Sequence, residues 1–388
     1  MKVLFVSDLQ LGAGADLGTG GEYGPGSRFA DQEANLDRIV GIAETEQCGL
    51  VCVLGDVFER ATPRPFEILA FQSFVRRLRN DGARVLCILG NHDVKSAALP
   101  SALEIFGEQG VVVALGPSLY PVDDVVVATL PWTPLSRLVA ERPADDREGL
   151  HDLAAAALVE SARVLGARAT DEYPGAARIL VGHWAVSGGA LPTGLPVELL
   201  REPVLSLDGL SEAGFDLAVF GHIHVPAVLR GAPAVISCGS PMVHNWGEAA
   251  VKHGVWVYDS AAPSLRFVEV ADRPFITLEP DADRLIDYPD EIEGVAVEGA
   301  LVRVRYTATE EQAQRIDIAA IRRSLHACGA FKVVFRPTIV RAARARVEEM
   351  HEGLDETAAF ELWLATQEET VPAERLREMH AGYLARLS

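Results

Sequence analysis

Short apolar runs, each ending in a polar residue, recur through the first 270 residues. The runs are rich in β-branched residues and cover positions 3–6, 50–54, 85–89, 179–181 and 217–220. Continuous apolar runs of this length are typical of strands buried on both faces. Helical spacing of apolar residues fills stretches between them, at 29–45, 65–80 and 152–165. Alternating strands and helices predict a layered α/β sandwich flanked by helices.

The pattern changes towards the carboxyl terminus. Short strands and turns without clear helices occupy 226–270, which we interpret as the second half of the same sandwich. A segment rich in Asp and Pro follows at 271–289, and then a strand, a helix and a strand at 301–306, 318–328 and 332–336. From about 346 the chain is helical and charged, with a break at Val371-Pro372. We therefore expect an α/β domain at 1–270, a small α+β capping domain at 271–345 and a helical tail at 346–388.

Composition narrows the choice of function. The formal net charge of the 388 residues is −20, whereas a protein that binds nucleic acid mainly by neutralising phosphates is expected to be basic. The charge argues against tight independent binding of nucleic acid. It does not exclude DNA as a substrate, because bound cations reverse the local field and a partner can supply basic surface. No apolar run approaches the ~20 residues that span a bilayer, and no leader is evident, so we expect a cytoplasmic protein without a membrane segment.

The residues that end the apolar runs are suited to binding metal ions. In chain order they are Asp8, Gln10, Asp56, Asn91, His92, His183, His222 and His224. Imidazole, carboxylate and amide groups together suit Mn, Fe or Zn better than Ca²⁺. One carboxylate can bridge two ions ~4 Å apart, which can activate water and clamp the phosphoryl oxygens of an in-line displacement. The other six histidines (His151, His244, His253, His326, His351, His380) are expected to be surface or structural residues, and the five scattered cysteines to be free core thiols.

These motifs resemble a known signature. The series D-x-Q, GDVFE, GNHD, GH and GHIH is similar to D-x-H, GD-x-x, GNH-D/E, GH and GH-x-H of the calcineurin-like metallophosphoesterases. The resemblance implies two divalent ions. The first would be held by Asp8, Gln10, Asp56 and His224, and the second by Asp56, Asn91, His183 and His222, with Asp56 bridging. It also implies that His92 orients the phosphate or protonates the leaving oxygen, with Asp93 as its orienting partner.

A narrower resemblance covers nearly the whole chain. LGAG followed by Arg28-Phe29, GDVFERATPRP, and Cys238 to Pro241 resemble the SbcD type of DNA repair exonuclease. This implies a DNA nuclease of an end-processing complex in DNA repair and recombination, with Mn as the first choice of metal and Mg, Fe or Zn as others. It implies a homodimer whose C-terminal helices, here 360–364 and 376–387, grip an SMC-like ATPase, SbcC. A helical pair folded on its own protein is the alternative for these segments.

Gln10 departs from the family pattern, which has histidine at this position. An amide oxygen is a weaker ligand than imidazole for borderline metals, so the first ion should bind less tightly. Because the other motif residues remain, we expect activity to be retained. Two alternatives stay open: a small-molecule phosphodiesterase or phosphatase, which shares every metal motif, and a catalytically weakened binding subunit. The seven glycines of 12–26 predict either a solvated loop or a mobile element beside the site.

Overall fold

The computed structural model describes residues 1–14, 17–18, 26–96, 99–138, 149–289, 296–340, 355–365 and 372–387. The chain divides into two compact units, Met1–Ile276 with Gly299–Leu301 and Thr277–Glu298 with Val302–Ser388. Much of the glycine-rich stretch 12–26 lies outside the described residues. So do His351 and the expected boundary between residues 345 and 346.

Two six-stranded sheets form the first unit. The first sheet has the order β14 (Ser264–Glu269), β13 (Gly254–Asp259), β1 (Lys2–Val6), β2 (Cys48–Leu54), β3 (Arg84–Ile88), β4 (Val112–Ala114). The second has the order β11 (Ala227–Gly231), β12 (Ala234–Ser237), β10 (Leu217–Gly221), β7 (Ala177–His183), β6 (Val125–Leu130), β5 (Ser118–Val122). Strands β1 to β4 are parallel, and so are β12, β10, β7 and β6. The outer strands β13, β14, β11 and β5 pair antiparallel.

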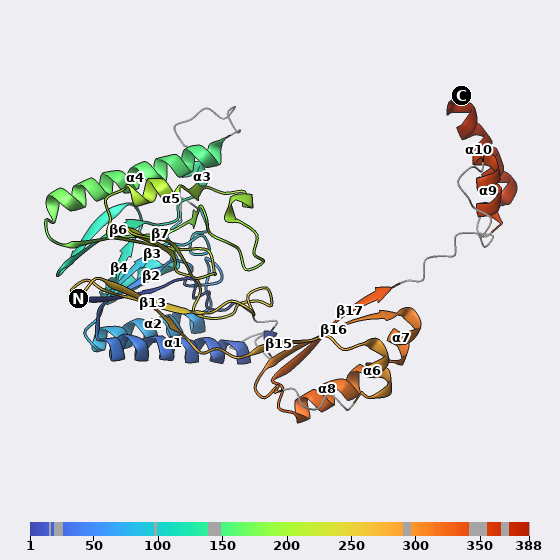
Figure 1. Cartoon of the computed structure of the whole chain (residues 1–388), viewed down its shortest axis with the longest axis horizontal. Helices are drawn as coiled ribbons and strands as arrows, with labels where there is room; N and C mark the ends of the chain where they lie inside the picture. Colours follow the sequence, from blue (N-terminus) through green and yellow to red (C-terminus); the bar gives the residue numbers. More distant parts are fainter. Residues whose placement is uncertain are drawn as a thin grey trace. The chain divides into compact units, whose positions relative to one another are not determined.

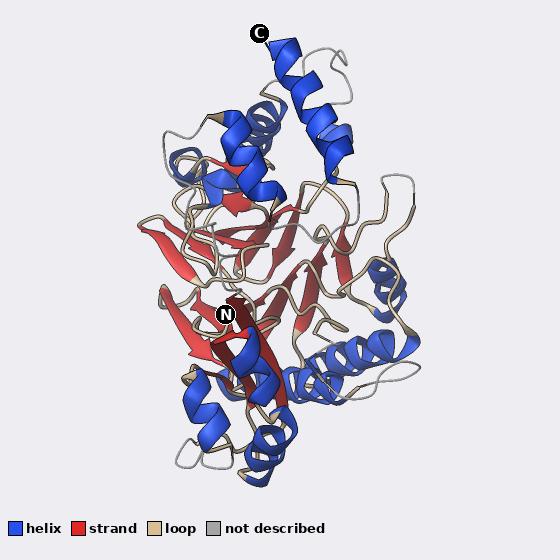
Figure 2. Ribbon diagram, turned by 90° about the vertical axis from the view of Figure 1, so that its right-hand side faces the viewer, coloured by secondary structure: helices blue, strands red, loops and turns tan. Residues whose placement is uncertain are grey.

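The two sheets pack face to face with helices outside them (Figures 1 and 2). Alternate residues of each strand fill the space between the sheets, as Phe5 and Val219 do. Residues with the opposite orientation, such as Leu4, pack under α1 (Ser27–Glu46) and α2 (Pro65–Asn80). Helix α4 (Leu150–Glu172) covers the second sheet. The strands are thus buried on both faces, and the predicted layered α/β fold is confirmed.

The local sequence accounts for the helices. Along α1 the buried residues recur every three or four positions, which forms one face for the sheet. Helix α2 begins with Pro65 at its first turn, where a missing N–H costs nothing, and the Glu67 carboxylate accepts the N–H of Arg64. Strands β4, β5 and β6 were not predicted, because their apolar runs do not end in a metal-competent residue. Of the five cysteines, four are buried and Cys328 is exposed, and all are free.

Most of a three-stranded sheet belongs to the second unit, in the order β15 (Phe275–Leu278), β16 (Leu301–Thr309), β17 (Lys332–Val340). The second unit also contains α6 (Ala282–Asp287), α7 (Glu310–Arg315), α8 (Ile318–Ala327), α9 (Glu356–Leu364) and α10 (Ala373–Leu387). Helix α8 begins at the Asp317 cap, whose side chain accepts the N–H of Ala320. No helix among the described residues is long and apolar enough to cross a membrane.

Candidate metal centre

The predicted ligands meet where parallel strands of both sheets end. Asp8 follows β1, Asp56 follows β2, His183 is the last residue of β7, and His222 follows β10. Carboxyl ends of parallel strands lie at the same edge of a sheet. A hydrogen bond joins the two sheets here, since the N–H of His222 donates to Asp8 Oδ2 over 3.0 Å. Ligands more than 200 residues apart are therefore brought together by strand order and sheet packing.

The loops that carry the ligands have unusual backbone conformations. Asp8, Gln10, Asp56 and His222 all have positive φ, between 40° and 88°. Residues other than glycine adopt this region at a cost, and they do so mainly at functional sites. Gly90 is required by close packing, because a Cβ there would lie 2.1 Å from Asp56 Oδ1. The strained backbone conformations thus turn these side chains towards one point.

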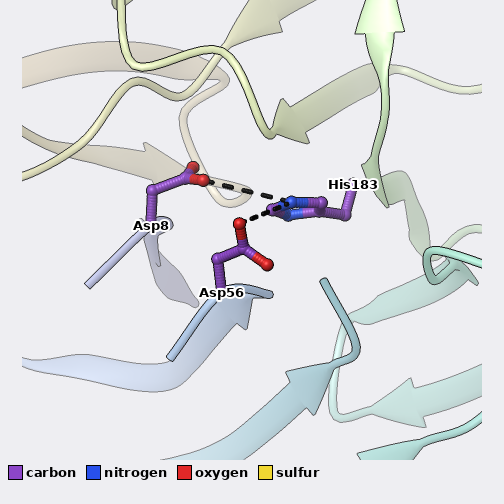
Figure 3. A group of neighbouring side chains, drawn as sticks. All are labelled: Asp8, Asp56 and His183. Carbon is purple, nitrogen blue, oxygen red and sulfur yellow. Dashed lines mark ion pairs between the residues drawn. The ribbon is translucent and has the colours of Figure 1, made fainter. Parts of the chain in front are cut away.

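Asp8, Asp56 and His183 form the centre of the site (Figure 3). His183 Nε2 lies 3.4 Å from Asp56 Oδ2 and 4.0 Å from Asp8 Oδ1. All three side chains are buried, and no group among the described residues donates a hydrogen bond to Asp8 Oδ1. A buried carboxylate oxygen without a donor is costly. This orphaned oxygen fits a site that holds a cation.

A second group of donor atoms converges on Asn91. Its Oδ1 lies 3.1 Å from His183 Nε2 and 3.0 Å from His222 Nδ1. The opposite ring nitrogens face oxygens that only accept: His183 Nδ1 faces the carbonyl of Leu54 at 2.6 Å, and His222 Nε2 faces Glu202 Oε1 at 2.7 Å. In their neutral forms, both rings therefore carry the proton on that side. Three lone pairs are left facing one another, an arrangement that suits a divalent ion.

Gln10 and His224 lie beside Asp8. His224 Nε2 is 3.6 Å from Asp8 Oδ1, and its Nδ1 faces Glu248 Oε1 at 2.9 Å. Because the carboxylate accepts the Nδ1 proton, Nε2 carries a lone pair. Gln10 Nε2 lies 3.3 Å from this nitrogen and donates to it. The structure thus brings Gln10 to the predicted first-ion position, with its amide nitrogen turned towards His224.

His92 and Asp93 differ from the expected pairing. His92 Nδ1 donates to the carbonyl of Glu59 over 2.7 Å, and its Nε2 lies 3.9 Å from Asp56 Oδ2. Asp93 is buried and accepts the backbone N–H groups of Asp56, Val57 and Gly90. The expected role of Asp93 as orienting partner of His92 is therefore wrong: a carbonyl orients the ring, and Asp93 fixes the loops after β2 and β3.

Burial and charge act in opposition at this site. Burial opposes ionisation of Asp56, but the charges of His183 and His92 hold the pKa of that carboxyl well below its usual range. Burial also disfavours the charged form of His183, yet the Asp56 carboxylate outweighs it and raises the pKa of His183 to about 10. For Asp93, burial and the neighbouring Asp56 charge raise the pKa to about 7. Without a cation, the Asp56 and Asp8 carboxylates thus favour a protonated His183 ring.

Sequence reasoning missed the residues that support the ligands. Glu202 and Glu248 contact His222 and His224, and Gln32 of α1 donates to the carbonyl of Gln10. His244, expected as surface or structural, is buried and its Nε2 donates to the carbonyl of Asp8 over 2.8 Å. No spacing rule marks such residues. The nearest signal is the turn that begins at Cys238-Gly239-Ser240-Pro241, because Glu248 follows it closely.

The match to a family model agrees with the geometry. The model of the calcineurin-like phosphoesterase family matches residues 1–226. The chain is 26% identical to the SbcD subunit of the nuclease SbcCD of Escherichia coli K12 over 298 residues, covering 71% of this chain and 68% of that protein. Among solved structures it aligns with a dimetal phosphatase from Danio rerio, with 13% identity and a TM-score of 0.44, over 70% of this chain and 97% of that one. An archaeal phosphodiesterase aligns at 13% identity with a TM-score of 0.32, over 69% and 99%.

The family match spans every motif from Asp8 to His224 and more than half of the chain. The matched residues supply carboxylate, amide and imidazole donors where strands of the two sheets end, as metal-assisted phosphoester hydrolysis requires. The chain therefore belongs to the calcineurin-like phosphoesterase family and is a metal-dependent phosphoesterase.

Proposed function

We propose that this phosphoesterase is a DNA nuclease that acts with an SMC-like ATPase of the SbcC type. The observation that carries the proposal is the grouping of donor atoms at the strand ends, with His92 accessible beside them. The side chain of His92 is 35% exposed, whereas those of Asp8, Asp56 and His183 are buried. The similarity to the SbcD subunit of the nuclease SbcCD directs the choice of DNA as substrate.

The ligand assignment follows the donor sets. The first ion would be held by Asp8, Gln10, Asp56 and His224. The second ion would be held by Asp56, Asn91, His183 and His222. Two divalent ions bound there would supply Lewis acidity to phosphoryl oxygens and lower the pKa of water. The mixture of imidazole, carboxylate and amide suits Mn, our first choice, and also Fe or Zn, with Mg as a further candidate.

His92 is proposed as the catalytic residue. The Glu59 carbonyl holds the proton on Nδ1, so neutral His92 presents a lone pair at Nε2, close to Asp56 Oδ2. A ring that also carries a proton at Nε2 can orient a phosphate oxygen or protonate the leaving oxygen. Asp93 supports this chemistry indirectly, since it holds the backbone of Asp56 and Gly90.

The experiment is cleavage of linear duplex and single-stranded DNA, with bis-p-nitrophenyl phosphate in parallel, in the presence of Mn²⁺. His92→Ala is compared with His326→Ala, which removes a histidine of the second unit. We expect cleavage of DNA by the wild type and by His326→Ala, and its loss in His92→Ala. Hydrolysis of the small ester alone, also when the ATPase is added, would favour the small-molecule phosphodiesterase. No hydrolysis of either would favour the weakened binding subunit.

The C-terminal helices are proposed to dock the ATPase. Helices α9 and α10 are joined by the Arg377–Glu361 ion pair and by stacking of Phe360 on His380. Trp363, Met379 and Tyr383 are large and exposed, as expected of a surface that covers another protein. Removing residues 346–388 should abolish co-purification with the ATPase and leave hydrolysis of the small ester unchanged. A truncated chain that still binds the ATPase would contradict the docking role.

Four further expectations belong to the same proposal. Homodimerisation is tested by light scattering of the purified chain, where the mass of a single copy would refute it. A cytoplasmic location and a role in DNA repair and recombination stay predictions. The division into a nuclease domain at 1–270, a capping domain at 271–345 and a tail at 346–388 is tested by limited proteolysis.

A further inference from the structure

Two glutamates outside the predicted ligand set each contact one histidine of the site. Glu248 Oε1 lies 2.9 Å from His224 Nδ1, and Glu202 Oε1 lies 2.7 Å from His222 Nε2. We propose that they are positioning residues, one for each ion. Glu248 makes His224 present Nε2 to the first ion, and Glu202 makes His222 present Nδ1 to the second. The inference rests on the proposed two-ion assignment.

Glu248 is part of a rigid buried network. Its side chain is 2% exposed. Oε1 accepts from the side chain of Asn245 over 2.6 Å as well as from His224, and Oε2 accepts the N–H of His244 over 2.8 Å. In each contact a donor group faces a carboxylate oxygen, which can only accept. The proton of His224 is therefore fixed on Nδ1, and Nε2 is left to face Asp8 Oδ1 at 3.6 Å.

The same turn also supports a second ligand of the first ion. His244 is buried, and its Nε2 donates to the carbonyl of Asp8 over 2.8 Å. Its ring lies 5.2 Å from that of His224. Asp8 and His224 are assigned to the first ion only, and both are held by residues 244–248. This turn therefore acts on one ion of the pair.

Glu202 makes a different contact on the other side of the site. It precedes β9 (Val204–Leu205), and its side chain is 30% exposed. Because its carboxylate faces His222 Nε2, the free lone pair of His222 lies on Nδ1, 3.0 Å from Asn91 Oδ1. Glu202 and Glu248 thus select opposite ring nitrogens in His222 and His224. A histidine held in the wrong tautomer presents a proton to the ion instead of a lone pair.

The test uses Glu248→Gln and Glu202→Gln in the full chain. Glutamine keeps the size of the side chain but adds an N–H donor and removes the charge. Glu198→Gln is the matched control, because Glu198 is close in sequence to Glu202 and its carboxylate accepts the backbone N–H of Gly188. Chelated protein is titrated with Mn²⁺ by calorimetry, and paired ions are counted by their exchange-coupled electron paramagnetic resonance signal. His224→Ala and Asn91→Ala, which each remove a ligand of one ion, assign the two binding events.

We expect Glu248→Gln to weaken the first ion by about 10- to 100-fold, the usual cost of losing a partner of a metal-bound histidine, and to leave the second unchanged. Glu202→Gln should do the reverse, and Glu198→Gln should change neither. Equal weakening of both ions by either variant, or of neither ion, would overturn the inference.

Two controls separate other failures. A wild-type chain that binds fewer than two Mn²⁺ would refute the proposed two-ion site itself. Thermal unfolding in EDTA shows whether a variant is folded. If Glu248→Gln does not fold, the inference is tested by Glu202→Gln, because Glu202 is more exposed. This variant must then weaken binding of the second ion and leave the first unchanged.

Discussion

Replacing Gln10 by histidine should strengthen binding of the first ion. In the structure the Gln10 amide donates to His224 Nε2 over 3.3 Å. That nitrogen is the one His224 would present to the ion, because its Nδ1 proton is held by Glu248. Binding an ion at Nε2 must therefore break the bond to Gln10 and turn the amide so that its oxygen faces the ion.

The structure allows the effect to be estimated. A neutral internal hydrogen bond contributes about 0.5–1.5 kcal/mol net. With RT of ~0.59 kcal/mol, this free energy corresponds to a factor of about 2 to 13 in affinity. Imidazole is also a better ligand than an amide oxygen for Mn, Fe or Zn. The two effects act in the same direction, so Gln10→His should raise first-ion affinity by about tenfold or more.

Calorimetric titration of chelated protein with Mn²⁺ measures this directly. The second ion serves as an internal control, since Gln10 is not among its predicted ligands and its affinity should not change. Thermal unfolding in EDTA should show that the substitution leaves the fold intact. Unchanged affinity at the first site would refute the reasoning, because it would mean that residue 10 neither ligates the ion nor competes for His224.

Asp56→Ala should lose both bound metal and activity, whereas His92→Ala should lose about 10²–10⁴-fold in activity and keep its metal; equal metal loss in the two variants would refute these roles. The pKa of His183 is raised to about 10 in the ion-free protein. Protonation of this ring therefore stabilises the ion-free fold fully at pH values below ~6.5, the ordinary pKa of histidine. The stabilisation is lost as pH rises through about 10. Binding of the second ion at neutral pH should thus release a proton, and binding heats that are identical in buffers of different protonation enthalpy would contradict this. Arg28→Met should lower the free energy of unfolding by about 3–5 kcal/mol, since the buried guanidinium pairs with Asp272; a loss below ~1 kcal/mol in urea would show that this pair is not needed.

The fold was largely predictable because strands buried on both faces are continuous apolar runs. The helix predicted at 65–80 matches α2, and the run at 217–220 lies within β10. The predicted ligands are recognisable for the same reason, since each follows such a run within a few residues. Strand pairing across the two sheets was not predictable, because it depends on contacts between residues far apart in the sequence. β13 pairing beside β1 is an example.

The supporting residues could not be predicted from pattern. Glu248 accepts hydrogen bonds from His224 and from two residues of its own turn, and the apolar periodicity does not mark that turn. The resemblance to the family motif implied that Asp93 orients His92. In the structure the Asp93 side chain instead accepts backbone donors from another loop. Side-chain direction at a strand end depends on backbone torsions such as the positive φ of Asp56, which residue type alone does not determine.

The charge of the site bears on the conflict between a net charge of −20 and the proposed polyanionic substrate. Four carboxylates surround the donor atoms: Asp8, Asp56, Glu202 and Glu248. Two divalent ions would balance these four negative charges, so a phosphodiester would meet less repulsion at the site. Attraction then comes from the ions and not from a basic surface. Because the salt dependence of DNA binding scales with the number of phosphates neutralised by Lys and Arg, the isolated chain should bind DNA weakly, only with metal, and with a shallow dependence on salt. A steep dependence of DNA binding on salt would instead require a basic surface on this chain. The proposed ATPase partner would then not be needed to supply that surface.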